Sequence, residues 1–414
     1  MKAIDLLTEG TAMRFDFTTI PDRHNHDAIA IDGLGDGTGF APAAPKEGFD
    51  SIPLWVADMS FATAPSVTRA IHERVDHPFF GYYSETDAYY QAIIDWHQNQ
   101  KGVSDLAKEH IGYENGVLGG VVSALNILCS KGDNVLVHSP TYVGFTGCCT
   151  NNGYNLVHSP LVLDDAGVWR MDFEDMERKI VDNHIHAAIF CSPHNPCGRV
   201  WERWELEQAM ALFEKHGVFV VSDEIWSDLL LNGNVHIPTQ QVSDWAHDHT
   251  IALYAPSKTF NLAGLIGSYH VIYDQWLRDR VCKESSLGHY NSQNVLSMHG
   301  LIGAYSEEGA AWTKELCQVL SDNVNYACEK LASYEGVTCA KAEGTYVLLA
   351  DCRTWCDARG ISYADFPHLG WDVGVTWHDG RLFECPGFVR IAVSVPHAQV
   401  VEAFDRLDRY VFGT

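Results

Sequence analysis

The stretch Ala187-Ala-Ile-Phe-Cys191 is a continuous apolar run, and Ser192-Pro-His-Asn-Pro-Cys-Gly198 follows it directly. A short apolar run that ends in turn-forming residues is typical of a strand buried on both faces of a sheet. A helical pattern over residues 202–215 comes next, and a second apolar run covers residues 218–222. Strand, helix and strand in this order predict two parallel strands joined by a crossover helix.

The same alternation continues on both sides of this unit. Three more short runs are strand-like: residues 134–138, 251–254 and 270–273. Four stretches have helical spacing: residues 67–75, 89–96, 121–128 and 172–181. We therefore expect an α/β fold whose large domain, residues 60–295, holds a mainly parallel sheet flanked by helices.

After residue 295 the pattern changes to long helical stretches followed by two strand-like runs, at residues 346–350 and 388–393. The first 50 residues are irregular and rich in glycine and proline. We expect residues 296–414, together with an N-terminal arm over residues 1–59, to form a smaller α+β domain.

The composition excludes several classes of protein. The chain has 414 residues, 46% of them hydrophobic and 20% charged, which is the balance of a globular protein. Its 54 acidic and 28 basic residues give a formal net charge of −26, which argues against nucleic acid or an anionic membrane as a partner. No apolar run in the sequence approaches the ~20 residues that a membrane span needs.

Neither the cysteines nor the histidines form a recognisable sequence motif. The 12 cysteines are scattered without a CxxC motif, and the first ten residues contain neither an apolar stretch nor a cleavage site. We therefore expect a cytoplasmic protein with reduced thiols. The 21 histidines include no HExxH motif and no zinc-ligand spacing, so we expect no metal.

Glycines at positions 33, 35 and 37 suggest the dinucleotide-binding motif of a nicotinamide-dependent dehydrogenase. That motif needs a strand before it and a helix after it. Here no strand pattern precedes the glycines, and Pro42 and Pro45 follow them. We interpret this segment as a loop or arm.

Polar side chains follow four of the expected strands. They are Tyr142, Asn195, Asp223 and Lys258. Ligands of open α/β sheets bind at the carboxyl ends of the strands, so we expect these four residues to share one rim.

A lysine and a buried aspartate at one rim are typical of pyridoxal phosphate chemistry. A desolvated lysine amine attacks a carbonyl to form a Schiff base, and pyridoxal phosphate supplies that carbonyl. The cofactor's ring nitrogen needs an acidic partner to stay protonated. Its phosphate needs donors such as a glycine-rich helix N-terminus, which Gly119-Gly120-Val-Val-Ser123 offers.

The sequence resembles the fold-type I pyridoxal phosphate enzymes of the aminotransferase class I/II superfamily. Within them it is most similar to the cystathionine β-lyase-like carbon–sulfur lyases. The matching motifs run through most of the chain: Leu54-Trp-Val-Ala-Asp-Met59, Phe80-Gly-Tyr82, Pro140-Thr-Tyr142, Pro193-His-Asn-Pro196, Ser222-Asp-Glu-Ile225, Ala255-Pro-Ser-Lys-Thr-Phe-Asn-Leu-Ala-Gly264, Glu343-Gly-Thr-Tyr346 and Phe388-Val-Arg390.

The resemblance implies roles for the residues that would hold the cofactor. Lys258 would form the Schiff base with pyridoxal 5'-phosphate and move the Cα proton, and Asp223 would pair with the ring nitrogen. The other implied contacts are Asn195 at the ring oxygen, Tyr142 stacked on the ring, Trp226 as an N–H donor, and Ser257 with the backbone of Gly120, Val121 and Val122 at the phosphate.

The resemblance also implies a homodimer with shared active sites. Tyr82 would act in catalysis by reaching the phosphate bound in the neighbouring subunit. Arg390 would hold the α-carboxylate of an amino-acid substrate through a bidentate pair of hydrogen bonds. The backbone of Val56 and Ala57 would assist it.

The function that the resemblance implies is an α,β-elimination, in which cystathionine or another cysteine S-conjugate gives pyruvate, ammonia and a thiol. Many aminotransferases of the superfamily have arginine at the position of Ile266, and its absence favours a lyase. Trp226 stands where the lyases usually have histidine, so transamination of an α-amino acid stays open as the alternative. A regulatory or binding protein on the same scaffold is a third possibility.

Overall fold

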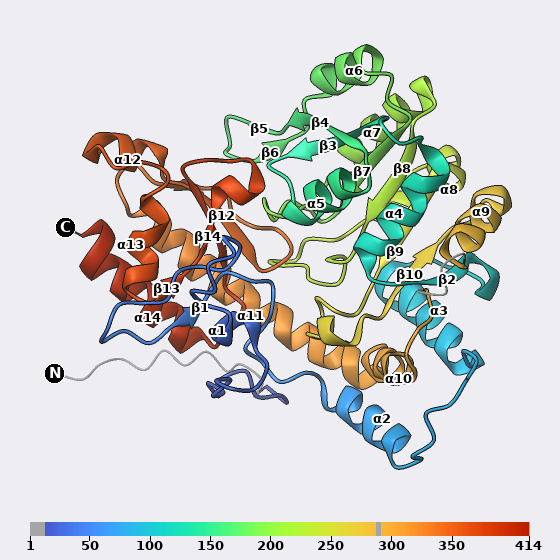
Figure 1. The fold of residues 1–414 in the computed structure, drawn as a ribbon, viewed down its shortest axis with the longest axis horizontal. Coiled ribbons are helices and arrows are strands. Elements are labelled where there is room, and N and C mark those ends of the chain that lie inside the picture. Colours follow the sequence, from blue (N-terminus) through green and yellow to red (C-terminus); the bar gives the residue numbers. More distant parts are fainter. Residues whose placement is uncertain (1–12, 287–290, 414) are drawn as a thin grey trace.

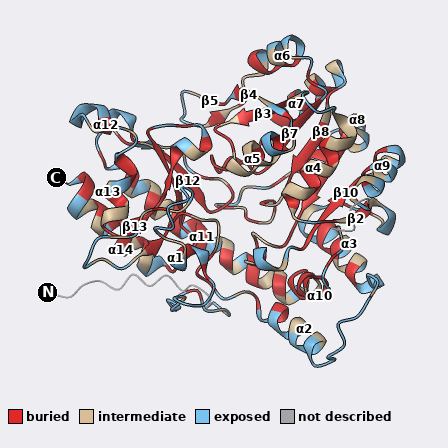
Figure 2. Ribbon diagram, viewed as in Figure 1, coloured by how far each residue is buried: buried red, intermediate tan, exposed pale blue. Residues whose placement is uncertain are grey.

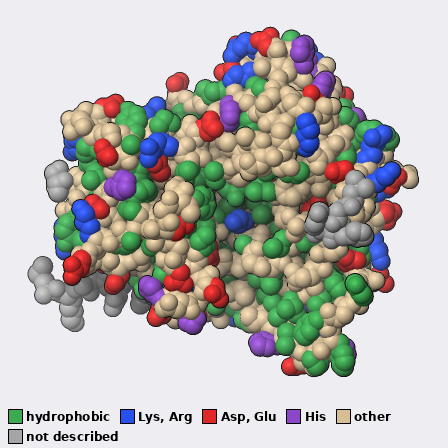
Figure 3. Space-filling model, in the orientation of Figure 1, with side chains coloured by type: hydrophobic (Ala, Val, Ile, Leu, Met, Phe, Trp, Pro, Cys, Tyr) green, Lys and Arg blue, Asp and Glu red, His purple; other side chains and the backbone are tan. Residues whose placement is uncertain are grey.

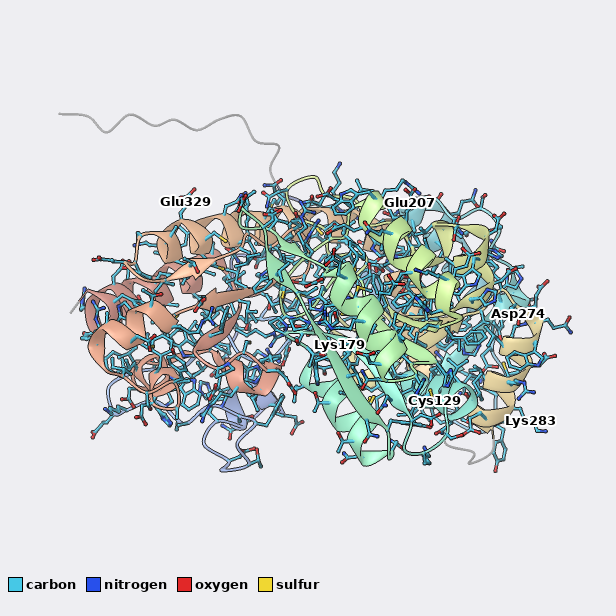
Figure 4. All side chains as sticks on the ribbon, turned by 90° about the horizontal axis from the view of Figure 1, so that it is seen from above. Cys129, Lys179, Glu207, Asp274, Lys283 and Glu329 are labelled. Carbon is cyan, nitrogen blue, oxygen red and sulfur yellow. The ribbon has the colours of Figure 1, made fainter. Side chains whose placement is uncertain are left out.

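The structure is a computed structural model that describes residues 13–286 and 291–413. The first ten residues, which contribute to the expected cytoplasmic location, lie outside the described residues. Figure 1 shows two groups of elements, one green to yellow and the other red, with helix α11 (Glu307–Ala332) passing from one towards the other. In the view from above, Glu329 of α11 and Lys283 of α9 (Gln275–Ser286) lie at opposite ends of the molecule (Figure 4).

The larger sheet has seven strands in the order β2-β10-β9-β8-β7-β3-β4. Their bounds are β2 Ile111–Glu114, β3 Asn134–Ser139, β4 Asn155–Pro160, β7 Ala187–Cys191, β8 Phe219–Asp223, β9 Thr250–Tyr254 and β10 Ser268–Val271. The five strands from β9 to β4 are parallel, and β10 is antiparallel to both of its neighbours. This arrangement confirms the expected α/β fold with a mainly parallel sheet.

Helices cover both faces of this sheet, and the strand side chains alternate between them. Ala188 and Phe190 of β7 belong to the core beneath α6 (Phe173–Asp182), α7 (Arg203–His216) and α8 (Asp244–His249). Ala187, Ile189 and Cys191 belong to the opposite core, beneath α4 (Val117–Leu128), α5 (Val143–Asn151) and α9. Figure 2 shows the strands buried between these layers. Burial on both faces explains why the strand sequences are continuously apolar.

A second, antiparallel sheet has the order β11-β12-β15-β14. Its strands are β11 Thr338–Cys339, β12 Val347–Asp351, β14 His378–Asp379 and β15 Phe388–Ala392. The N-terminal arm joins this part of the chain, because β1 (Ile52–Pro53) pairs with β13 (Val375–Thr376). The domain boundaries expected at residues 59/60 and 295/296 stay predictions.

The remaining elements complete the layers around the two sheets. They are α1 Ile29–Asp32, α2 Pro65–Val75, α3 Asp87–Lys101, α10 Val295–Ala304, α12 Arg353–Arg359, α13 Phe366–Asp372, α14 His397–Leu407, the short strands β5 Val162–Leu163 and β6 Trp169–Arg170, and the single turns η1 Lys108–His110, η2 Thr239–Gln241, η3 Ala263–Leu265, η4 Gly380–Phe383 and η5 Asp408–Phe412. Within residues 13–286 and 291–413, none of the helices has the length and apolar character needed to span a membrane.

Candidate active site

A cavity of about 310 Å³ lies at the carboxyl ends of the parallel strands, and the four predicted rim residues all line it. Asp223 is the last residue of β8, and Tyr142, Asn195 and Lys258 follow β3, β7 and β9. The prediction that these residues share one rim is therefore confirmed. In Figure 3 the face of the molecule is hollowed near its centre, with hydrophobic side chains around a Lys or Arg at the bottom.

The amine of Lys258 is held by the N-terminal arm. Its Nζ donates to the carbonyl oxygen of Ala57 over 3.1 Å. Asn261, three residues further along, holds the same segment through two hydrogen bonds to Met59. Its Oδ1 accepts from the Met59 amide, and its Nδ2 donates to the Met59 carbonyl. Burial, with a smaller contribution from the positive charge of Arg390, lowers the pKa of Lys258 to about 8. The side chain therefore becomes a neutral nucleophile or base much more readily than an ordinary lysine.

Asp223 is almost inaccessible, with 4% of its surface exposed. Its Oδ1 accepts a hydrogen bond from the backbone amide of Ile225 over 3.1 Å. Burial raises the pKa of Asp223 to about 7, although the Ile225 amide and the charge of Lys258 act in the opposite direction. A cationic partner inside the cavity would offset this burial and keep the carboxylate ionised.

Arg390, on β15, lies beneath the cavity with 2% of its surface exposed. Its Nε donates to Oδ1 of Asn195, and its Nη1 donates to the carbonyl oxygen of Trp55 and to Nδ1 of His378. Because a guanidinium only donates, the Asn195 amide must turn its oxygen to Arg390, which leaves its Nδ2 free to donate. The nitrogen Nη2 of Arg390 has no partner among the described residues and is available to a carboxylate.

Aromatic side chains form the walls of the cavity. The ring of Tyr142 leans over Gly144 of α5, where an added Cβ would lie 2.4 Å from the ring. On the other side the ring centroid of Trp226 lies 5.7 Å from Nζ of Lys258. Tyr346 packs edge-on against Trp226 and fixes its ring, with the two centroids 4.8 Å apart.

The helix that carries the predicted phosphate contacts begins earlier than expected. The sequence suggested that the helix begins at Val121, whereas α4 begins at Val117 after Gly116, whose φ of 77° favours glycine. The amide of Gly120 therefore donates to the carbonyl of Gly116, and Val121 and Val122 lie further inside the helix. The residues of the first turn, Val117, Leu118 and Gly119, line the cavity together with Ser257, whereas Gly120, Val121 and Val122 do not.

The structure also places Val56, Ala57 and Tyr82. Val56 and Ala57 line the cavity, and their role beside the substrate carboxylate stays a prediction. The carbonyl of Trp55 accepts from Arg390, and that of Ala57 accepts from Lys258. Tyr82 does not line the cavity of its own chain, and its side chain is fully exposed, at 111%. Its role in a neighbouring subunit stays a prediction.

The lining residues that the sequence did not single out include Phe40, His378 and Phe383. His378 accepts from Arg390 through Nδ1, and burial together with the charge of Arg390 keeps its pKa well below the ordinary value. Its imidazole is therefore neutral, with the proton on Nε2. The motif Phe388-Val-Arg390 was the only signal in this part of the chain, and it points to Arg390 alone.

Comparisons with known proteins agree with this geometry. Residues 50–407 match the model of the family described as aminotransferase class I and II. Cystathionine beta-lyase PatB of Bacillus subtilis is 36% identical over 318 residues, covering 76% of this chain and 80% of that protein. Protein MalY of Escherichia coli is 30% identical over 357 residues, covering 85% and 86% of the two chains. The solved structure of the PLP-bound C-S lyase from Staphylococcus hominis has 28% identity and a TM-score of 0.86, covering 97% of this chain and 99% of that chain.

Proposed function

Because the chain belongs to the aminotransferase class I and II family, we propose that it is a pyridoxal-phosphate-dependent carbon–sulfur β-lyase. The reaction removes a thiol from Cβ of cystathionine or another cysteine S-conjugate, and hydrolysis of the remaining enamine gives pyruvate and ammonia. One observation carries the proposal. Lys258 with its lowered pKa, the buried acid Asp223 and the buried cation Arg390 face the same cavity.

The residues present fit this cofactor. Among the described residues Asp223 forms no ion pair, and the charge of Lys258 offsets only part of its burial, so a protonated pyridine nitrogen would supply the missing partner. Gly144 leaves room for the Tyr142 ring, which can then stack on a planar ligand. The first turn of α4 and the Ser257 hydroxyl are suitable donors for a phosphate. When bound, pyridoxal phosphate supplies the Schiff-base carbonyl and the electron sink for a carbanion at Cα.

Lys258 does the proton transfer. Because its pKa is lowered to about 8, about a tenth of its amine is unprotonated at pH 7, far more than in an ordinary lysine. The free Nζ can take the proton from Cα, which starts the departure of the thiolate from Cβ. The hydrogen bond to the Ala57 carbonyl aims the amine into the cavity.

Arg390 orients the substrate. Its Nη2 offers two N–H donors to an α-carboxylate, while Asn195 and Trp55 hold the rest of the guanidinium in place. Because Arg390 and Lys258 come from different sheets, we propose that residues 60–295 and the two flanking segments are domains that close on the substrate. Closure excludes water from the reacting carbanion.

The proposal for the oligomer and the location rests on other observations. Phe79, Phe80 and Tyr82 are 69%, 56% and 111% exposed, and such an aromatic segment is suited to packing on a second copy of the chain. We therefore propose a homodimer in which Tyr82 reaches the neighbouring site. All 12 cysteines are free thiols, which supports a location in the cytoplasm.

The experiment that tests the function is an assay of the holoenzyme with L-cystathionine and S-methyl-L-cysteine and without a keto-acid acceptor. A lyase gives sustained pyruvate with matching amounts of ammonia and thiol. Lys258→Ala serves as the inactive control. If pyruvate does not accumulate over many turnovers and product appears only with an added keto acid, the chain is an aminotransferase and the proposal is wrong.

A further inference from the structure

A glycine-rich loop over residues 33–45, here called the glycine loop, lies beside the active-site cavity. The structure fixes it at both ends. Before it, the indole Nε1 of Trp55 donates to the carbonyl of Ala30, and after it Lys46 bonds Asp372 through both its backbone and its side chain. Between these points the amide of Gly35 donates to the carbonyl of Pro42, which closes the loop.

Phe40 lies near the end of this closed segment, and its side chain separates the active-site cavity from a neighbouring pocket. Its ring centroid is 5.2 Å from that of His378 and 5.7 Å from that of Trp55. Both Phe40 and His378 line the active-site cavity, and both also line a second pocket of about 600 Å³. The two rings therefore stand between an inner cavity, which holds Lys258, and an outer pocket.

Two glycines near Phe40 lie in open space. Gly37 and Gly39 have φ values of 74° and 80°, and a Cβ at either position would meet no atom within 4 Å. Glycine is required there by the backbone conformation and not by crowding. No packed contact therefore restrains the backbone at either glycine.

The charges around the two spaces indicate which substituents they accept. In the inner cavity the charged lining residues are Asp223, Lys258 and Arg390, which the proposed cofactor and α-carboxylate use. In the outer pocket the charged lining residues are Arg381 and Asp379, and they neutralise each other through a hydrogen bond of 2.7 Å from Nε and a second contact of 2.5 Å from Nη2. No further Lys, Arg, Asp or Glu lines either space within the described residues.

The remaining walls are largely aromatic and apolar. They include Trp226 and Ile266 in the inner cavity and Trp371 and Leu382 in the outer pocket. An ammonium at the far end of a substituent would lose its hydration here without gaining an unpaired carboxylate, and a carboxylate would gain at most the unpaired Nε2–H of His378. An aromatic or aliphatic substituent loses nothing comparable and gains contact area.

We propose that Phe40 is a specificity-determining residue, that the two spaces disfavour an S-substituent that carries an ammonium group, and that large aromatic substituents enter the outer pocket when the Phe40 ring moves aside. This inference rests on the proposed function, because it concerns the substituent on the sulfur of the same substrate. The preferred substrates are thus S-alkyl and S-aryl conjugates of cysteine, in preference to cystathionine with its zwitterionic tail.

The test compares the wild-type holoenzyme with the Phe40→Ala and Phe40→Trp variants. The substrates are S-methyl-L-cysteine, S-benzyl-L-cysteine and L-cystathionine. We expect Phe40→Ala to raise the kcat/KM ratio of S-benzyl- to S-methyl-L-cysteine by about tenfold, and Phe40→Trp to lower it by a similar factor. Trp276→Ala is the matched control, because Trp276 is a half-exposed aromatic residue that lines neither space. An unchanged ratio in both Phe40 variants overturns the role of Phe40.

A binding measurement separates this inference from the proposed function. The dissociation constants of the same amino acids are read from the change in cofactor absorbance, which does not require elimination. If the wild type releases no pyruvate from any substrate, the proposed function is wrong, and the binding ratios of the Phe40 variants still decide the present inference. A wild type that binds cystathionine more tightly than S-benzyl-L-cysteine overturns the assigned substrate class.

Discussion

The side chain of Arg390 on β15 bonds that of Asn195, which follows β7, with 3.2 Å between Nε and Oδ1. This contact joins the two sheets at the floor of the cavity. It also couples the residue proposed to hold the substrate to one proposed to hold the cofactor. Each side chain therefore depends on the other for its orientation.

Replacing Asn195 by alanine tests this dependence. The variant leaves one N–H of a buried guanidinium without its acceptor, at a cost of about 1.5–3 kcal/mol. We expect KM for the amino-acid substrate to rise by about tenfold or more, measured by steady-state kinetics. Asn155→Ala, at an exposed strand position, is the control and should leave KM unchanged.

A double-mutant cycle shows whether the two residues act together. Arg390→Lys alone should also raise KM, because lysine lacks the fork that contacts Asn195 and Trp55 at once. In the double variant the increase should be smaller than the product of the two single effects. Fully multiplicative effects would contradict the coupling.

Gly144 gives a second prediction, with a control in the same helix. Gly144→Ala places a Cβ 2.4 Å from the ring of Tyr142, so the ring must turn away from the cavity. We expect the variant to bind its cofactor at least about tenfold more weakly, since stacking of a planar ring on an aromatic side chain contributes ~1–3 kcal/mol. Cofactor dissociation is followed by absorbance during dialysis.

Gly147→Ala is the matched variant, because its Cβ would meet no atom within 4 Å and it also lies in α5. Alanine in place of a helical glycine should stabilise the fold by about 0.5–1 kcal/mol and leave the cofactor bound. Equal cofactor loss in both variants would show that α5, and not the Tyr142 ring, is responsible.

Much of this site could be predicted because parallel topology makes local signals converge. Asn195, Asp223 and Lys258 each follow an apolar strand, and the carboxyl ends of parallel strands meet at one edge of a sheet. No contact between distant segments had to be known. The same reasoning located Tyr142 after β3.

The missed residues depend on contacts that no local pattern encodes. Phe40 meets His378 because the N-terminal arm returns to a distant part of the sequence, where β1 pairs with β13. The start of α4 was misplaced for a different reason. Gly119-Gly120 resembles a helix boundary, but Gly116, with its positive φ, is the residue that caps the helix.

The pKa of Asp223 predicts a pH dependence of stability in the protein freed of cofactor. Burial raises this pKa from 3.8 to about 7. Between those values the folded chain keeps a proton that the unfolded chain has released, so the contribution of Asp223 to stability is lost as the pH rises to about 7. Asp223→Asn removes this titration and should flatten the profile.

Urea unfolding of the apoprotein at about pH 5.5 and about pH 8 measures the effect. We expect Asp223→Asn to be more stable than the wild type at the higher pH by about 2–4 kcal/mol, and the difference to shrink at the lower pH. In the presence of cofactor we expect Asp223→Asn to be less stable than the wild type, because the variant loses the partner of the ring nitrogen and releases its cofactor. Asp279→Asn, on an exposed position of α9, is the control, and an equal profile in both variants would sink the prediction.

The full exposure of Tyr82 leads to a test of the shared site. In a hybrid dimer of one Lys258→Ala chain and one Tyr82→Ala chain, a Tyr82 that acts across the interface restores one complete site out of two. Random mixing makes half of the dimers hybrids, so the mixture should recover about a quarter of the wild-type activity from two nearly inactive parents. A Tyr82 that served its own chain would leave every hybrid site incomplete, and mixing would restore nothing. Tyr410→Ala, another exposed tyrosine, should be as active as the wild type before mixing, which shows that loss of an exposed ring is harmless in itself.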